Sequence, residues 1–86
     1  MMVFVCEHGA AKSVLAAAYF DKLARELNLD LWAIARGTNP DPELSPQTIA
    51  GLTADDLSPI ESIPKRLTES DIQSARRVVS FCKLPV

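Results

Sequence analysis

The stretch that most constrains this chain is residues 3–13, which read VFVCEHGAAKS. β-Branched and aromatic residues end in Cys6, small residues follow, and Lys12 and Ser13 open a long amphipathic segment. A strand, a small-residue loop and a helix N-terminus in this order bring backbone N–H groups together, and the helix dipole adds positive charge. A cysteine at the strand end of such a loop is favoured as a thiolate and therefore as a nucleophile. This stretch predicts an anion-binding loop around a reactive thiol.

The rest of the chain predicts a small α/β scaffold for this loop. Strand, helix and strand follow one another over about the first thirty residues, which is typical of a right-handed βαβ unit with parallel strands. We expect a parallel sheet in the order 2-1-3 with helices on both faces. The predicted strands cover residues 2–6, 31–35 and 77–82, the predicted helices cover 12–27, 46–52 and 68–75, and 58–66 is an irregular connection.

Local signals support these helices. In the first helix, Leu15, Tyr19, Leu23 and Leu27 recur at four-residue spacing, with Ala16 and Phe20 beside them, and are predicted to face the core. Small alanines at 16–18 would let this helix lie close to the sheet. Ser45 followed by Pro46 marks the start of the second helix. Thr68 and Asp71 resemble a capping box at the start of the third.

Length and composition exclude several classes of protein. Eighty-six residues predict a single domain over 1–86, and 48% hydrophobic residues are those of an ordinary globular protein. A net charge of −2 argues against nucleic-acid binding, and no apolar run approaches the ~20 residues of a membrane span. We find no secretory signal, so we expect a reducing cytoplasmic location in which Cys6 and Cys82 are free thiols. One histidine and two cysteines have no metal-ligand spacing, and no cofactor is expected.

Residues 6–13 resemble the phosphate-binding loop C-x-G-N-x-x-R-S of the low-molecular-weight protein tyrosine phosphatases and of the thioredoxin-coupled arsenate reductases that share their fold. Residues 35–38 (ARGT) are similar to the S-A-G-T of that superfamily. Residues 42–52 are similar to its second helix, and 64–71 (PKRLTESD) to its A-R-x-L-T-x-x-D segment. The matches follow one another in the same order along the whole chain, which is far more specific than the loop alone.

The resemblance implies that Cys6 attacks a phosphate monoester, or an arsenate, in line. Ser13 would donate a hydrogen bond to the Cys6 sulfur, and Lys12 would stand where the superfamily has arginine. Lysine is a point charge rather than a planar fork, so we expect a loss of roughly 2–4 kcal/mol in transition-state stabilisation. Gly9, in place of asparagine, readily adopts left-handed backbone angles. The anion-binding loop implied by the resemblance consists of Glu7, His8, Gly9, Ala10, Ala11 and Lys12.

One departure concerns the general acid. The superfamily places an Asp-Pro acid after a fourth strand, and neither that strand nor that acid has a counterpart in this sequence. The chain is therefore either a fragment truncated at its C-terminus or a reduced member with weak or no phosphatase activity. A non-catalytic oxyanion-binding or relic domain is the further alternative.

Other readings of single residues stay open. Cys82 is either a buried thiol or, as the resemblance to the arsenate reductases implies, a resolving thiol for Cys6 that would depend on a thioredoxin-type reductant. Cys6 could instead be only a small hydrophobic residue at the end of a strand. His8 is interpreted as a loop residue rather than as a catalytic residue. A nucleotide-binding loop, G-x-x-x-x-G-K-[ST], is disfavoured because Cys6 and Ala11 replace its two glycines. The third strand would leave an apolar sheet edge, which predicts a homodimer through that edge.

Overall fold

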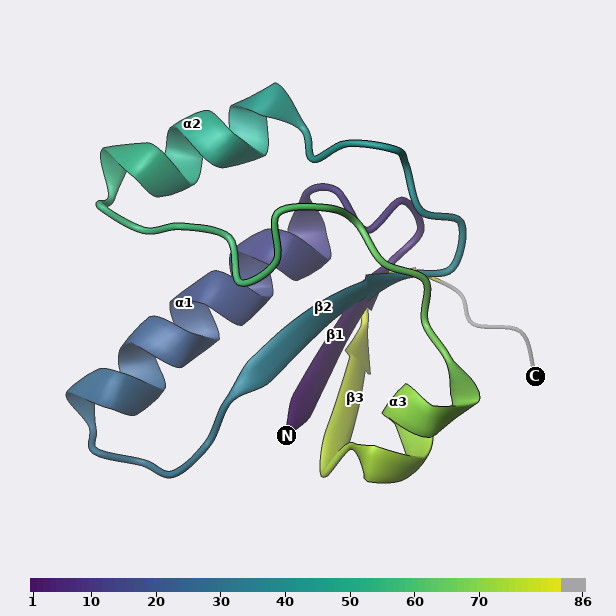
Figure 1. Ribbon diagram of the computed structural model, residues 1–86. Coiled ribbons are helices and arrows are strands. Elements are labelled where there is room, and N and C mark those ends of the chain that lie inside the picture. The colour runs from purple at the N-terminus through teal and green to yellow at the C-terminus, as the bar shows by residue number, and fades with distance from the viewer. Residues whose placement is uncertain (83–86) are drawn as a thin grey trace.

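The computed structural model describes residues 1–82 as a three-stranded parallel sheet with three helices (Figure 1). The strand order is β2-β1-β3, and both neighbours of β1 run parallel to it, which confirms the predicted order and direction. The elements in chain order are β1 (Met2–Cys6), α1 (Lys12–Glu26), β2 (Ala33–Gly37), α2 (Pro46–Ala54), α3 (Glu69–Ser74) and β3 (Arg77–Ser80).

Helices cover both faces of the sheet, as expected. Figure 1 shows α1 and α2 on one side and α3 on the other. Because side chains alternate along a strand, Phe4 of β1 packs against Ala17 of α1, whereas Val3 and Val5 join a cluster that contacts Ala75 at the end of α3. The carboxyl ends of the strands therefore remain available to carry a site, since the helices pack on the faces.

The predicted core stripe of α1 is confirmed for Leu15, Ala16 and Phe20, which pack against the core, but it is wrong for the other three residues. Leu23 and Leu27 are 54% and 59% exposed, and Tyr19 is also exposed. The buried positions of the helix are instead Ser13, Val14, Ala17, Ala18 and Ala24. Small side chains let the helix backbone approach β1 and β2 closely, so the alanine face, rather than the leucine face, turns to the sheet.

The second strand lies two residues further along the chain than the predicted 31–35. β2 continues through Arg36 to Gly37, and Gly37 pairs with Cys6 at the end of β1. The prediction ended the strand before Arg36 because a charged residue followed by glycine is typical of a turn. Arg36 continues the strand because two carboxylates, described below, bind its guanidinium group.

The third strand is shorter than predicted and less buried. β3 ends at Ser80, and of the predicted core residues Val79 and Phe81 are exposed, while Val78 packs against the buried cluster. Within residues 1–82, β3 pairs with β1 alone, so it is an edge strand. Phe81 stacks on Phe4, with ring centroids 6.4 Å apart. Among residues 1–82, α1 packs mainly on β1 and β2 rather than on β3.

The helix starts were predicted with mixed success. The capping box of α3 is confirmed: Asp71 N–H donates to Thr68 Oγ1 at 3.1 Å, and Thr68 N–H donates to Asp71 Oδ2 at 3.0 Å. Pro46 begins α2 as predicted, but within the described residues Ser45 makes no side-chain capping bond. Asn28 ends α1 in a left-handed conformation, with φ of 55°. In the described part of the chain, no helix is both long enough and apolar enough to cross a membrane.

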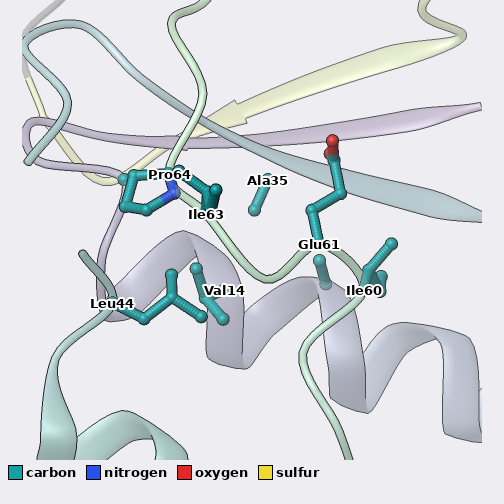
Figure 2. Close-up of a pocket in the computed structure, with 9 residues that line it drawn as sticks. Val14, Ala35, Leu44, Ile60, Glu61, Ile63 and Pro64 are labelled. Atoms are coloured by element: carbon teal, nitrogen blue, oxygen red, sulfur yellow. The ribbon is translucent and has the colours of Figure 1, made fainter. Parts of the chain in front are cut away.

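The connection 58–66 packs over α1 and β2 and closes a small apolar hollow (Figure 2). Ile60, Ile63 and Pro64 line it from the connection, and Val14 and Ala35 line it from the helix and the strand. Its cavity volume is about 10 Å³, room for no more than a water molecule. This hollow is part of the core packing and not a ligand site.

Candidate active site

Cys6 is the last residue of β1, and its thiol lies at the floor of the loop that leads into α1. The residue is 7% exposed, and its Sγ lies 3.0 Å from Oγ of Ser13, which is fully buried in the first turn of the helix. A thiolate has no hydrogen to donate, so the Ser13 hydroxyl group is the donor when Cys6 is ionised. Two residues seven positions apart are thus brought into contact by the strand–loop–helix turn.

The carbonyl groups of the loop point outward. A second loop, residues 38–45, supplies N–H groups that bind them. Thr38, Asn39, Asp41 and Ser45 donate to the carbonyl oxygens of Cys6, Glu7, His8 and Ala10 at 3.2, 2.7, 2.9 and 3.1 Å, respectively. With its carbonyl groups held on the outside, the loop turns N–H groups toward the sulfur, which is the arrangement an anion requires.

These N–H groups change the acidity of the thiol. Burial alone raises the pKa of Cys6, but the hydrogen bond from the Ser13 side chain and the N–H groups of Ser13, Ala11 and Gly9 outweigh it and lower the pKa below 9.0. Hydrogen bonds to the charged form favour that form. The site therefore stabilises a thiolate, which is the nucleophilic species.

The N-terminus of α1 is open to an anion. Ala11 occupies the N-cap position, and within residues 1–82 no side chain caps this end of the helix. The first N–H groups of a helix have no partner inside it, so they bind a capping side chain, water or a ligand. Here they adjoin the Cys6 sulfur, and an oxyanion above that sulfur would bind them.

Two glycines fix how the loop is placed. Gly9 has a φ of 61°, which confirms the left-handed geometry expected at this position. It crosses Gly37, the last residue of β2, so closely that a Cβ atom on Gly37 would lie 2.8 Å from Gly9 N. Gly37 was not predicted as a site residue. Its only signal was the similarity of residues 35–38 to S-A-G-T.

Arg36, next to Gly37, anchors the segment that supports the loop. Its Nε lies 3.0 Å from Asp71 Oδ2, and its Nη1 binds Glu61 Oε1. We call Arg36, Glu61 and Asp71 the Arg36 cluster. Burial raises the pKa of both carboxylates. Arg36 together with Lys65 outweighs burial at Glu61, and Thr68 with Arg36 does so at Asp71, so the pKa values of both carboxylates are lowered. The cluster holds β2 in place, and Gly37 at the end of this strand lies against the loop that follows Cys6.

A pocket of about 310 Å³ opens above Cys6. It collects the predicted thiol, the predicted cation Lys12 and most of the predicted loop, and it adds residues from two other segments. It is lined by Cys6, Glu7, His8, Ala10, Ala11, Lys12, Asp41, Ser45, Phe81 and Cys82. Lys12 is exposed and forms no ion pair with any residue from 1 to 82, so its charge is available to an anion.

The pocket also brings together the two cysteines. Cys82 follows β3 and lies at the carboxyl edge of the sheet, as Cys6 does at the end of β1. Within the described chain both are free thiols. Ser80 Oγ accepts a hydrogen bond from Cys82 N–H at 3.2 Å and lies 3.6 Å from its Sγ. Both thiols therefore line the same pocket.

Asp41 and Ser45 were not predicted as site residues. They line the pocket because loop 38–45 binds the loop after Cys6 through backbone groups. Contacts of this kind leave no pattern of side chains in the sequence. In the range 1–82, no group of three or more His, Cys, Asp or Glu side chains could hold a metal ion.

No protein-family model and no curated protein sequence matches the chain. Solved structures do. A low-molecular-weight protein tyrosine phosphatase from T. tengcongensis aligns with a TM-score of 0.84 and 22% identity, over 92% of this chain and 56% of that one. The fold is that of the low-molecular-weight protein tyrosine phosphatases. An arsenate reductase from Archaeoglobus fulgidus aligns with a TM-score of 0.85 and 23% identity, over 100% of this chain and 70% of that one.

An arginine phosphatase from Drosophila shares the same fold, with a TM-score of 0.83 and 16% identity over 92% of this chain and 52% of its own. The superfamily resemblance inferred from the motifs is thus confirmed at the level of the fold. The chain spans about half the length of the phosphatases it matches.

Proposed function

We propose that this protein is a thiolate-dependent phosphatase that hydrolyses phosphate monoesters through a phosphocysteine on Cys6. The observation that carries the proposal is the Cys6 sulfur itself, which adjoins an uncapped helix N-terminus and accepts hydrogen bonds from Ser13 and from loop N–H groups. The same N–H groups would bind the three equatorial oxygens of the phosphoryl group as charge develops on them. The protein tyrosine phosphatase from T. tengcongensis agrees with this assignment, and the arginine phosphatase from Drosophila agrees with removal of a phosphoryl group but not with a monoester substrate.

One neighbour supports the chemical role of the cysteine position. The arginine phosphatase YwlE has been solved as a cysteine-to-serine mutant with a phosphorylated active-site serine. In this chain we assign the corresponding role, acceptance of the phosphoryl group, to Cys6. Glu7, His8, Gly9, Ala10 and Ala11 form the wall of the loop, and Lys12 supplies the cation.

Lys12 is expected to limit the rate. It gives one point of charge where a guanidinium group would clamp two oxygens, so the bound anion is held but the transition state is held less well. We expect Lys12→Arg to raise turnover of an aryl phosphate by up to about 10²-fold, the scale of one major oxyanion donor. Lys22→Arg, in the same helix but away from the pocket, is the matched control.

The test is an aryl phosphatase assay on wild type, Cys6→Ser and Lys12→Arg side by side. The proposal requires turnover that Cys6→Ser abolishes, and turnover that survives Cys6→Ser would overturn it. Phosphate binding without turnover, even in Lys12→Arg, would identify a non-catalytic oxyanion-binding module instead.

The second candidate is arsenate reduction, which the presence of Cys82 in the same pocket favours. The Cys6 thiolate would bond to arsenic while one arsenic–hydroxyl bond breaks and its oxygen leaves as water after taking a proton, and the Cys82 thiolate would then attack the Cys6 sulfur. A disulfide forms, the electron pair of the sulfur–arsenic bond passes to arsenic, and arsenite leaves. A thioredoxin-type dithiol would restore the two thiols. This candidate predicts one disulfide per arsenate consumed in wild type and none in Cys82→Ala.

The remaining assignments are proposals of the same kind. We infer that residues 1–86 act as one domain in a reducing, cytoplasmic setting, where both thiols stay free. We also propose a homodimer through β3, which within residues 1–82 is an edge strand with the exposed apolar residues Val79 and Phe81 beside it. Native mass spectrometry that detects only monomer at micromolar concentration would contradict the dimer.

A further inference from the structure

His8 and Asp41 form a pair at the mouth of the pocket. Nδ1 of His8 lies 3.2 Å from Oδ1 of Asp41, and both side chains are about half exposed. Their backbones are joined as well, since Asp41 N–H donates to the His8 carbonyl oxygen at 2.9 Å. The backbone bond fixes the two residues to each other, so the side-chain contact follows from how the two loops are connected.

The contact decides which ring nitrogen is free to react. A carboxylate only accepts hydrogen bonds, so the nitrogen that faces Asp41 is the one that carries a hydrogen. This leaves Nε2 as the nitrogen that can exchange a proton with a ligand. Nε2 is 3.7 Å from Glu7 Oε2, which is too long for a hydrogen bond, so Glu7 does not hold that proton.

The pocket gives His8 the right neighbours for acid–base chemistry. Cys6, the proposed nucleophile, lies at the floor of the pocket with a pKa lowered by hydrogen bonds, and Lys12 is an exposed cation that we assign to the anion. An imidazole both donates and accepts protons near neutral pH, which an ionised carboxylate or an ammonium group does poorly. The titratable groups that line the pocket from the three segments around it are Cys6, Glu7, His8, Lys12, Asp41 and Cys82.

We propose that His8 is the proton donor to the leaving group in the phosphatase reaction, and that Asp41 is the positioning residue that orients its ring. This inference rests on the proposed function, because it needs a phosphoryl group bound above Cys6. It departs from the reading of His8 as an ordinary loop residue. The departure comes from the contact with Asp41 and from the pocket that both residues share with Cys6.

The proposed reaction has two steps, transfer of the phosphoryl group to Cys6 and hydrolysis of the phosphocysteine. The Cys6 thiolate attacks phosphorus, the P–O bond to the leaving group breaks with its electron pair on oxygen, and that oxygen takes the Nε2 proton of His8 imidazolium. The products are an alcohol, neutral His8 and phosphocysteine. Water then attacks phosphorus, the P–S bond breaks with its pair on sulfur, and Nε2 takes one proton from the water. Phosphate leaves, and the Cys6 thiolate and His8 imidazolium are restored.

The experiment compares two substrates that differ in how much they need a proton donor. The p-nitrophenolate group of p-nitrophenyl phosphate leaves readily unprotonated, whereas the phenolate group of phenyl phosphate depends more on a proton. We expect His8→Asn to lower kcat/KM on phenyl phosphate by about 10²-fold and on p-nitrophenyl phosphate by much less. Asp41→Asn should shift the ratio between the substrates in the same direction, but less. Asp30→Asn, an exposed carboxylate outside the pocket lining, should not shift it.

The possible results distinguish a failure of the His8 proposal from a failure of the proposed phosphatase function. If wild type shows no turnover that depends on Cys6, the proposed phosphatase function is wrong and this inference falls with it. If wild type turns over through Cys6 but His8→Asn lowers both substrates by the same factor, His8 has only a structural role and this inference alone is wrong. A loss on phenyl phosphate in His8→Asn that p-nitrophenyl phosphate does not share, with Cys6→Ser inactive, would support both.

Discussion

A single methyl group at Gly37 would test how the phosphate loop is held. In Gly37→Ala the added Cβ would lie 2.8 Å from Gly9 N, 3.0 Å from Gly9 Cα and 3.0 Å from the carbonyl carbon of His8. All three are backbone atoms, so no side chain can rotate away and the loop itself must move. Overpacking of this kind costs about 1–3 kcal/mol of folding free energy. Displacing one N–H donor from an anion removes a charge-assisted hydrogen bond, which is worth about 1.5–3 kcal/mol.

Two measurements on the same variant distinguish these effects. Urea unfolding should show the loss of stability, and calorimetric titration with inorganic phosphate should show binding weakened by about tenfold or more. Gly51→Ala is the matched control, because a Cβ there meets nothing within 4 Å in helix α2. It should stabilise the protein by about 0.5–1 kcal/mol and leave phosphate binding intact. A Gly37→Ala protein that binds phosphate as tightly as wild type would refute the reasoning.

Three further predictions concern acidity and support. Ser13→Ala, in a Cys82→Ala background, should slow alkylation of Cys6 by iodoacetamide by about tenfold or more at low pH, since it removes a hydrogen bond to the thiolate worth about 1.5–3 kcal/mol. Ser45→Ala, in the same pocket, should leave the rate unchanged. Because folding lowers the pKa of Cys6, the unfolded chain holds the proton over the range between the two pKa values. Stability should therefore rise with pH up to about 9, and Cys6→Ser should lose that rise in urea unfolding. Arg36→Gln should cost about 1–3 kcal/mol near neutral pH, with the difference from wild type shrinking as acid protonates the Arg36 cluster.

Much of the fold follows from the order of short apolar runs. A strand that feeds a helix and then a second strand predicts two parallel strands joined by a right-handed crossover, and the predicted order 2-1-3 is the observed one. The packing face of α1 followed only in part: alanines 16–18 were expected to approach the sheet and do so, but periodicity also placed the large side chains Leu23 and Leu27 in the core stripe. Leu23 and Leu27 form the more hydrophobic stripe, yet closest approach to the sheet requires the alanines. Helix position is set by the fit between surfaces, which sequence periodicity does not contain.

The candidate site divides in the same way. The loop around Cys6 could be predicted because its residues are contiguous, from Cys6 to Ser13, and Cys6, Lys12 and Ser13 each have a chemical reason for their place. Gly37 and Asp41 were missed because they come from about thirty residues further along the chain. They reach the loop through backbone bonds and a glycine crossing. The resemblance to a known superfamily marked Gly37 only as part of a motif, and nothing in the sequence marked Asp41.

The central claim is that Cys6 carries the phosphoryl group, and acid-quenched peptide mass spectrometry after brief mixing with p-nitrophenyl phosphate tests it most directly. We expect one phosphoryl group on the peptide that contains Cys6. The label should be absent from Cys6→Ala and unaffected in amount by Cys82→Ala. Release of p-nitrophenol without label on that peptide, or with label elsewhere in the chain, would contradict the account.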